Sequence, residues 1–318
     1  MDSRTYPADP ADAALRIFLQ WFGRRYARSA RAHDLQSDDA VTRGAITVGR
    51  RWELGFALVN TLAADASLEF EAARSAIEQR LDESGRSIAL WAPRGAPLPT
   101  GDEALAQLLE SVQEARAIDD GRLEVRRPVE TFLRRTSTTG SVVTILGGLQ
   151  PHWAQFTNRV PGSFQLNSMQ LFRLPSSEEE REELAEQIVL AAQQPEIDDG
   201  TVVPAVDAWS ANDLEEGGSC VLGTPSPEDD EHSASLRRNL RKQLKFVSPV
   251  LAGDPAARAL ILLGASTYAQ DEKLSWAIRG MDPTLYSGFD FIIVIADGLA
   301  MPLLEPPAGA LPWDAPLR

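Results

Sequence analysis

Apolar positions recur along the chain with two periods, one helical and one alternating, and they divide it into alternating helices and strands. Near the start, Leu15, Phe18 and Phe22 recur at helical spacing, and Asp9-Pro10 supplies a cap and a first-turn proline. This pattern predicts an amphipathic helix over residues 11–31, with arginines on its other face. Further segments predict strands at 45–48, 52–59 and 87–91, a helix at 67–83, and a helix that begins at Gly101-Asp102.

The strongest hairpin pattern lies in the middle of the chain. Residues 123–135 and 141–149 have strand-like apolar content, and the short polar segment 136–140, which ends in glycine, joins them. We therefore predict that these two strands pair with each other as a long hairpin.

A capping box marks the next helix. Ser176 and Ser177 are each followed by a glutamate three residues later, which predicts a helix over 177–193. Its exposed side and the following loop are acidic, as is typical of a connector between domains. We predict a first domain over 1–175, a connecting helix and loop over 176–199, a second domain over 200–304, and a proline-rich tail over 305–318.

The second half repeats the alternation of strands and helices. Its predicted elements are strands 201–209, 219–222, 259–264, 289–296 and 300–304, and helices 233–247 and 270–280, with an Asp297-Gly298 turn before the last strand. The fold class is therefore α/β or α+β, with two mixed-sheet domains and flanking helices. The element order of 45–149 resembles that of 201–304. This similarity has two interpretations, a duplication or the ordinary likeness of alternating α/β chains.

Composition indicates a folded protein of the cytoplasm. The 318 residues are 43% hydrophobic and 24% charged, with a single cysteine, Cys220, which fits a reducing compartment. No apolar run approaches the roughly 20 residues that span a bilayer, and the first residues lack the pattern of a secretory signal. Only three of the 31 basic residues are lysine, a bias that suggests a GC-rich bacterial genome.

The most polarised part of the chain runs from residue 213 to 264. Seven acids without a base come first, and five bases without an acid follow within the predicted helix 233–247: Arg237, Arg238, Arg241, Lys242 and Lys245. Leucines at helical spacing would pack this helix on a sheet and present the bases together. One interpretation is a surface that binds an acidic partner or a polyanion. The other is that the bases neutralise the acidic loop 228–231 of the same chain.

A second candidate surface follows the predicted hairpin. Trp153, Phe156 and Arg159 lie close together in sequence, and aromatic side chains beside an arginine are common in binding hot spots. The alternative is that the aromatic residues anchor this loop to its own core.

Patterns for catalysis are weak. The chain has no Gly-x-Ser-x-Gly elbow, no phosphate-binding loop and no dinucleotide fingerprint. Its three histidines are far apart in sequence, and Cys220 lies in an apolar segment typical of a buried thiol. We therefore expect no cofactor.

A metal-dependent nuclease is the catalytic alternative. Asp229, Asp230 and Glu231, together with the triplet Asp271-Glu272-Lys273, resemble the carboxylates and lysine of the restriction-endonuclease-like architecture. The sequence departs from that pattern because the triplet falls in a predicted helix. Asp207 is an acid within the predicted strand 201–209 of the second half.

The leading hypothesis is a non-catalytic interaction or regulatory protein of a bacterial cytoplasmic assembly, which binds an acidic partner or polyanion through helix 233–247. We expect a protein partner and no membrane contact, with nucleic acid as an alternative ligand of the basic face. The other two hypotheses are a nuclease or its inactive relative within 200–304, and an oligomeric scaffold subunit.

Overall fold

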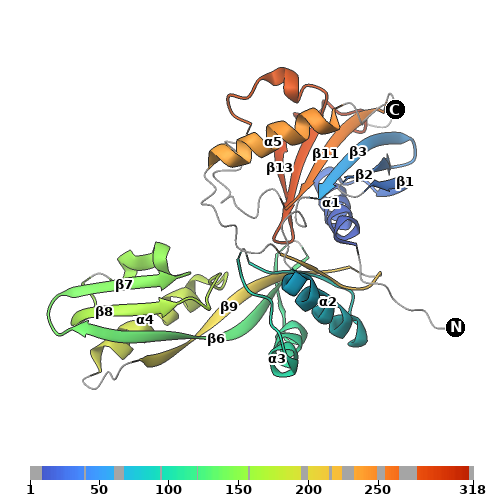
Figure 1. The fold of residues 1–318 in the computed structure, drawn as a ribbon. Coiled ribbons are helices and arrows are strands. Elements are labelled where there is room, and N and C mark those ends of the chain that lie inside the picture. The colour runs from blue at the N-terminus through green and yellow to red at the C-terminus, as the bar shows by residue number, and fades with distance from the viewer. Residues whose placement is uncertain are drawn as a thin grey trace. The chain divides into compact units, whose positions relative to one another are not determined.

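The computed structural model confirms a mixed α/β fold with two mixed sheets (Figure 1). It describes residues 9–38, 41–60, 68–93, 95–119, 121–156, 158–194, 200–214, 217–223, 233–248, 255–264 and 278–314. Two compact units result, unit 1 from Met1–Gly95 with Asn212–Arg318, and unit 2 from Ala96–Ala211. Within the described ranges, no helix is both long and apolar enough to cross a bilayer.

Unit 1 contains a six-stranded sheet built from both ends of the chain. Its strands, in the order β1-β2-β3-β11-β12-β13, are Ala30–Asp38, Val41–Val48, Trp52–Asn60, Ala257–Leu263, Phe291–Ala296 and Leu299–Leu304. The β3–β11 and β11–β12 pairs are parallel, and the outer pairs are antiparallel. The predicted Asp297-Gly298 turn is confirmed, because both residues have positive φ, as a tight hairpin between β12 and β13 requires.

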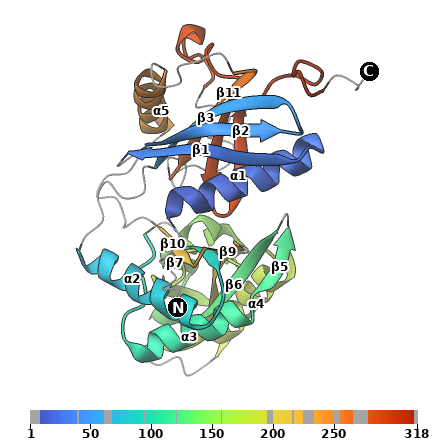
Figure 2. The same ribbon diagram turned by 90° about the vertical axis from the view of Figure 1, so that its right-hand side faces the viewer.

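Two helices cover opposite faces of this sheet. Figure 2 shows α1 (Pro10–Tyr26) on one face and α5 (Ser233–Val247) on the other. The α1 side chains Phe18 and Phe22 pack with Phe56 and Phe291 of the sheet. Alternate residues of the same strands point to the α5 side. The central strands are therefore apolar on both faces, as is typical of parallel strands between helices.

The predicted helix 11–31 is too long. Asp9 caps α1 as expected, since its side chain accepts a hydrogen bond from the Ala11 N–H at 2.9 Å. The helix ends at Tyr26 because Ala27 takes the left-handed conformation, with φ of 49°. The chain then turns into β1, which pairs with β2.

A second part of unit 1 joins a short parallel strand pair to a helix. The elements are α2 (Leu68–Glu83), β4 (Ile88–Trp91) and β10 (Cys220–Leu222). Two carboxylates of α2 accept hydrogen bonds from backbone N–H groups at β10. Glu78 Oε1 accepts from Val221 at 3.0 Å, and Asp82 Oδ1 accepts from Ser219 at 2.6 Å. They satisfy donors that an edge strand would otherwise leave unpaired.

Unit 2 contains a mixed sheet, with both antiparallel and parallel strand pairs, and helices packed on it. Its elements are α3 (Asp102–Gln113), β5 (Arg116–Asp119), β6 (Arg122–Ser137), β7 (Ser141–Gly147), the 3₁₀ turn η1 (Gln150–Gln155), β8 (Gly162–Ser168), α4 (Glu178–Gln193) and β9 (Thr201–Asp213), whose last two residues belong to unit 1. The strand order is β9-β6-β8-β7, and β5 pairs with β6.

The predicted hairpin of 123–135 and 141–149 is wrong in its pairing, although both strands exist. β8 lies between them, antiparallel to β6 and parallel to β7. Leu166 of β8, for example, lies opposite Leu133 on one side and Ile145 on the other. Because β8 lies between β6 and β7, β7 pairs only with β8 among the described strands. β7 is therefore an edge strand of the described sheet.

The predicted connector helix belongs to unit 2. Ser177 caps α4 as expected, with its hydroxyl accepting from the Glu180 N–H at 3.4 Å. The apolar side of α4 packs into the core with Leu133, Phe164 and Leu166. The division in the structure therefore differs from the predicted boundary at 176–199. The segments 45–149 and 201–304 also do not form separate sheets, because both contribute strands to the unit 1 sheet.

Candidate functional site: the basic face of α5

Three apolar side chains attach α5 to the sheet. Leu240, Leu244 and Val247 are at most 2% exposed and pack with residues of β3 and β11. Their spacing of four and then three residues puts them on one stripe of the helix. The orientation of α5 is thus set by the stripe that the sequence predicted.

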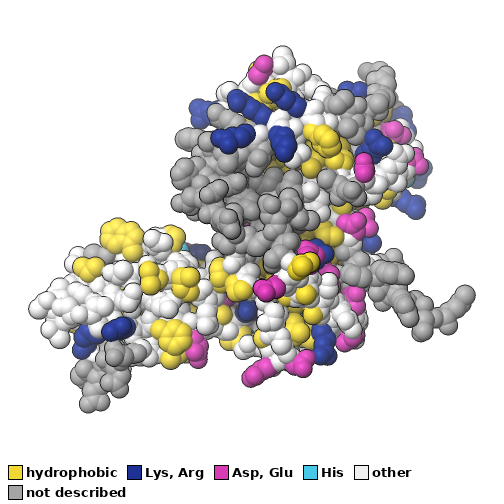
Figure 3. Space-filling model, in the orientation of Figure 1, with side chains coloured by type: hydrophobic (Ala, Val, Ile, Leu, Met, Phe, Trp, Pro, Cys, Tyr) yellow, Lys and Arg dark blue, Asp and Glu magenta, His cyan; other side chains and the backbone are white. Residues whose placement is uncertain are grey.

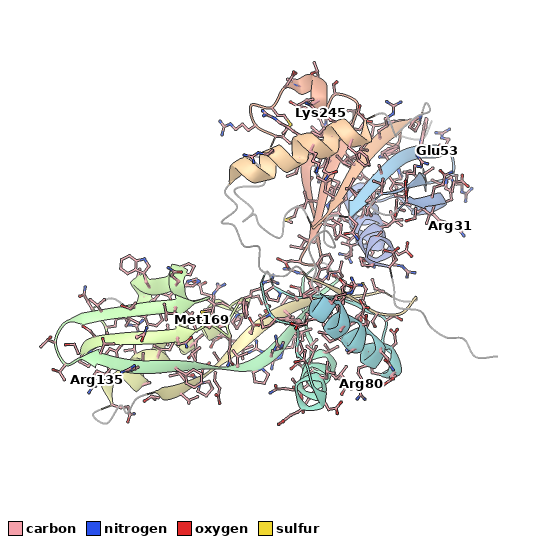
Figure 4. The ribbon with its side chains drawn as sticks, in the orientation of Figure 1. Arg31, Glu53, Arg80, Arg135, Met169 and Lys245 are labelled. Atoms are coloured by element: carbon pink, nitrogen blue, oxygen red, sulfur yellow. The ribbon has the colours of Figure 1, made fainter. Side chains whose placement is uncertain are left out.

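Four bases occupy the opposite side of the helix. The side chains of Arg238, Arg241, Lys242 and Lys245 are all exposed. At about 100° per residue they fall within an arc of roughly 100°, centred away from the buried stripe. Dark-blue side chains gather over α5 in Figure 3, and Figure 4 labels Lys245 on this helix. Arg237 is part of α5, but its side chain is outside the described set.

These bases are close to one another and have no described counter-ion. In the described part of the chain, no carboxylate lies within ion-pair distance of Arg238, Arg241, Lys242 or Lys245. Spacings of three and four residues create four like-charge pairs. Each such pair destabilises a helix by about 0.2–0.5 kcal/mol, or roughly 1–2 kcal/mol together at low salt. The acidic loop 228–231, the predicted intramolecular partner, lies outside the described residues.

An aromatic side chain borders the basic face. Phe246 follows Lys245 and is 53% exposed, although it belongs to a helix whose apolar residues are otherwise buried in the described segment. Phe246 does not fall on the leucine stripe, so the helical pattern gives no reason to single it out. The arrangement combines positive charge with one exposed apolar side chain.

The second predicted surface is only partly exposed. Trp153 is 59% exposed, but Phe156 is 1% exposed and packs in the core of unit 2. Arg159 is exposed and donates to the Gln155 carbonyl at 3.3 Å. Phe156 thus anchors the loop, as the alternative interpretation stated, and Trp153 is left on the surface.

Unit 2 exposes further apolar side chains that were not among the predicted surface residues. Val142 and Leu146 on β7 are 58% and 43% exposed, and Met169, labelled in Figure 4, is 60% exposed. Figure 3 shows apolar side chains spread over unit 2. The alternation of a strand gives a reason for this exposure, because residues 142, 144 and 146 point to the face opposite the buried Val143 and Ile145.

Asp207 has a structural role. Its side chain is fully buried; Oδ1 accepts from the Phe172 and Arg173 N–H groups at 2.8 and 2.9 Å, and Oδ2 accepts from Trp209 Nε1 at 2.9 Å. Arg127 Nη1 lies 3.7 Å from Oδ2, and its guanidinium stacks on the Trp209 ring at 4.4 Å. Burial lowers the pKa of Arg127, and the charge of Asp207 opposes that shift. Both oxygens of this carboxylate therefore accept hydrogen bonds from within unit 2.

The remaining carboxylates of the nuclease alternative, at 229–231 and 271–272, lie outside the described ranges, as does Lys273. Among the residues that are described, no group of three or more His, Cys, Asp or Glu side chains forms a metal site. Cys220 is buried, and burial raises the pKa of its thiol, so it is protonated at neutral pH.

Two arginines, one in the last turn of α1 and one just after the helix, make contacts within unit 1. Arg25 Nε and Tyr26 Oη both donate to Glu305 Oε1 at 2.7 Å, and Arg28 Nη2 donates to the Trp313 carbonyl at 2.9 Å. These contacts hold the last described turn of the chain near the end of α1.

Comparison with protein-family models, with curated protein sequences and with solved structures finds no match for the chain.

Proposed function

We propose that the protein is a non-catalytic interaction or regulatory protein that binds an acidic surface of a partner protein through the basic face of α5. The observation that supports this proposal is the exposed group Arg238, Arg241, Lys242 and Lys245. None of these side chains has a described counter-ion, although the chain has a net charge of −15. Such a concentration of like charge is unfavourable for the helix by itself. An acidic ligand would relieve it.

A protein ligand is favoured over nucleic acid for two reasons. The net charge of −15 repels a phosphate backbone at distances beyond the basic face. The exposed Phe246 beside the bases offers an apolar contact that a phosphate backbone would not use. The single cysteine and the arginine bias support a bacterial cytoplasmic location for this interaction.

The variant Arg241→Glu tests the proposal. The introduced carboxylate would lie three residues from Arg238 and four from Lys245, so it would replace repulsive pairs by attractive ones. The fold should be up to about 2 kcal/mol more stable at low salt, because two repulsive pairs become attractive. Binding to an acidic peptide containing aromatic residues, measured by fluorescence anisotropy, should become at least about tenfold weaker.

The matched control is Arg43→Glu on β2, which makes the same charge change at an exposed residue of the same unit. It should leave peptide binding within about twofold of the wild type. Equal weakening by both variants would mean that only net charge matters, which contradicts the proposal. Loss of stability in Arg241→Glu would show that the face is structural. Tighter binding of duplex DNA than of the peptide would favour the polyanion instead.

Self-association through β7 is a second candidate function, favoured by one observation. β7 ends the described sheet of unit 2, and Val142 and Leu146 on it are exposed. Exposed apolar edge strands tend to pair with another chain. Light scattering should then report a dimer or larger species that Val142→Lys converts to a monomer; a wild-type monomer at about 100 μM would argue against the scaffold hypothesis.

A further inference from the structure

A half-open cavity of about 700 Å³ lies in unit 1, on a different set of residues from the basic face of α5. Three segments far apart in sequence form it: residues 27–29 after α1, residues 48–52 around the β2–β3 turn, and residues 312–313. This volume falls within the range of cavities that hold small organic ligands, about 300–1,000 Å³.

Three guanidinium groups line the cavity. Arg28 is held in place by its hydrogen bond to the Trp313 carbonyl at 2.9 Å, while Arg50 and Arg51 are exposed. Within the described ranges, no carboxylate lies within ion-pair distance of any of the three. Arginine presents several N–H groups in a planar fork, which matches the oxygens of a phosphate.

Two acids near these segments have hydrogen-bond partners within unit 1. Glu305 accepts hydrogen bonds from Arg25 and Tyr26, and Asp314 Oδ2 accepts from the Gly309 and Leu311 N–H groups at 3.1 and 3.3 Å. The C-terminal end of α1 adds about half a negative charge, which is small beside three guanidinium groups. The cavity lining carries a positive charge, because it includes three arginines and no acidic residue.

Two indole side chains form apolar parts of the wall. Trp52 is half-buried on the α1 face of the sheet, and Arg51 stacks over its ring with 5.1 Å between Cζ and the ring centroid. Trp313 is 3% exposed, and its Nε1 is buried without an acceptor among the described residues. An indole beside several arginines suits a ligand with both a planar ring and a negative charge.

We propose that this cavity binds a small organic phosphate that carries a planar ring, of the size of a nucleoside monophosphate. Arg28, Arg50 and Arg51 hold the phosphate, and the ring packs against the indole of Trp52. The two parts of the ligand use different walls, so both are needed for affinity.

Isothermal titration calorimetry of the full chain tests the proposal, with AMP and GMP as probes and with adenosine, guanosine and inorganic phosphate as the partial ligands. At least one nucleotide should bind saturably, and each corresponding part at least about tenfold more weakly. The double variant Arg50→Gln/Arg51→Gln should weaken nucleotide binding at least about tenfold. The control Arg31→Gln/Arg43→Gln removes the same charge from exposed residues of β1 and β2 and should have no such effect (Figure 4).

Three results would overturn the proposal. The first is no saturable binding of either nucleotide up to about 5 mM. The second is equal loss of affinity in the two double variants, which would reflect net charge alone. The third is phosphate or the corresponding nucleoside binding as tightly as the nucleotide, because one wall would then account for all of the affinity. Trp52→Leu supplies a second readout, since it should weaken AMP binding more than that of inorganic phosphate; both are affected to some extent, because Arg51 stacks on the ring that is removed.

Discussion

The buried carboxylate of Asp207 supports a sharp test of the energetics of unit 2. The substitution Asp207→Ala removes one acceptor group from four donors: two backbone N–H groups, the indole of Trp209 and the guanidinium of Arg127. The cavity left behind cannot supply a replacement acceptor, because the side chain is fully enclosed.

The expected cost follows from the surroundings of each donor. A buried donor left without an acceptor costs about 1–3 kcal/mol, and the Trp209 indole, which is 1% exposed, is such a case. The two backbone N–H groups are partly buried and lie at the lower end of that range. Arg127 loses its counter-charge but keeps its contact with the Trp209 ring. We expect Asp207→Ala to lower the free energy of unfolding by about 3–5 kcal/mol.

Urea unfolding followed by far-ultraviolet circular dichroism measures this change, and hydrogen exchange of peptides from β9 locates it. Asp213→Ala is the matched control, because it lies on the same strand but has a side chain 62% exposed in a salt bridge to Arg86 at 3.2 Å. Surface pairs contribute about 0–1 kcal/mol. A difference between the two variants of less than about 1 kcal/mol would refute the role assigned to Asp207.

Three further predictions concern single side chains. Leu244→Ala should lower stability by about 2–4 kcal/mol in thermal or urea unfolding, because Leu244 is fully buried between α5 and the sheet. Ser177→Ala should cost about 1 kcal/mol and speed hydrogen exchange in the first turn of α4, since it removes the cap. Burial raises the pKa of Glu78, although the Val221 N–H and Arg74 oppose this shift. The folded protein therefore favours the protonated carboxyl group, and the free energy of unfolding falls as the pH rises through the pKa that Glu78 has in the folded protein. Glutamine at this position does not ionise, so the Tm of Glu78→Gln should rise relative to that of the wild type as the pH is increased from about 4 to about 8.

Local patterns predicted elements well because their causes lie within a few residues. The Asp9 and Ser177 caps, the Asp297-Gly298 turn and the leucine stripe of α5 all follow from neighbouring side chains. The end of α1 could not be predicted in this way. Ala27 adopts a conformation usually taken by glycine, and an alanine there gives no signal that the helix stops.

Strand partners and the shape of the cavity depend on contacts between distant segments. Alternation shows that β6 and β7 are strands, but it carries no information about which strand lies beside each. The charged face of α5 was visible in the sequence because its residues share one helix. Arg28, Arg50 and Trp313 meet only through the packing of α1, the β2–β3 turn and the last described turn, so no spacing rule connects them.

The parallel pairing of β3 with β11 has a consequence for synthesis on the ribosome. Leu54 lies opposite Ala257, so the two partners are roughly 200 residues apart, which corresponds to about 10–40 s at ribosomal rates of about 5–20 residues per second. During that interval the apolar side chains of β3 have emerged without the strand that covers their edge. All of unit 2, in contrast, lies between Ala96 and Ala211 and is complete before β11 is made. Translation therefore allows unit 2 to fold first. The sheet of unit 1 can be completed only after β11, β12 and β13 have been made.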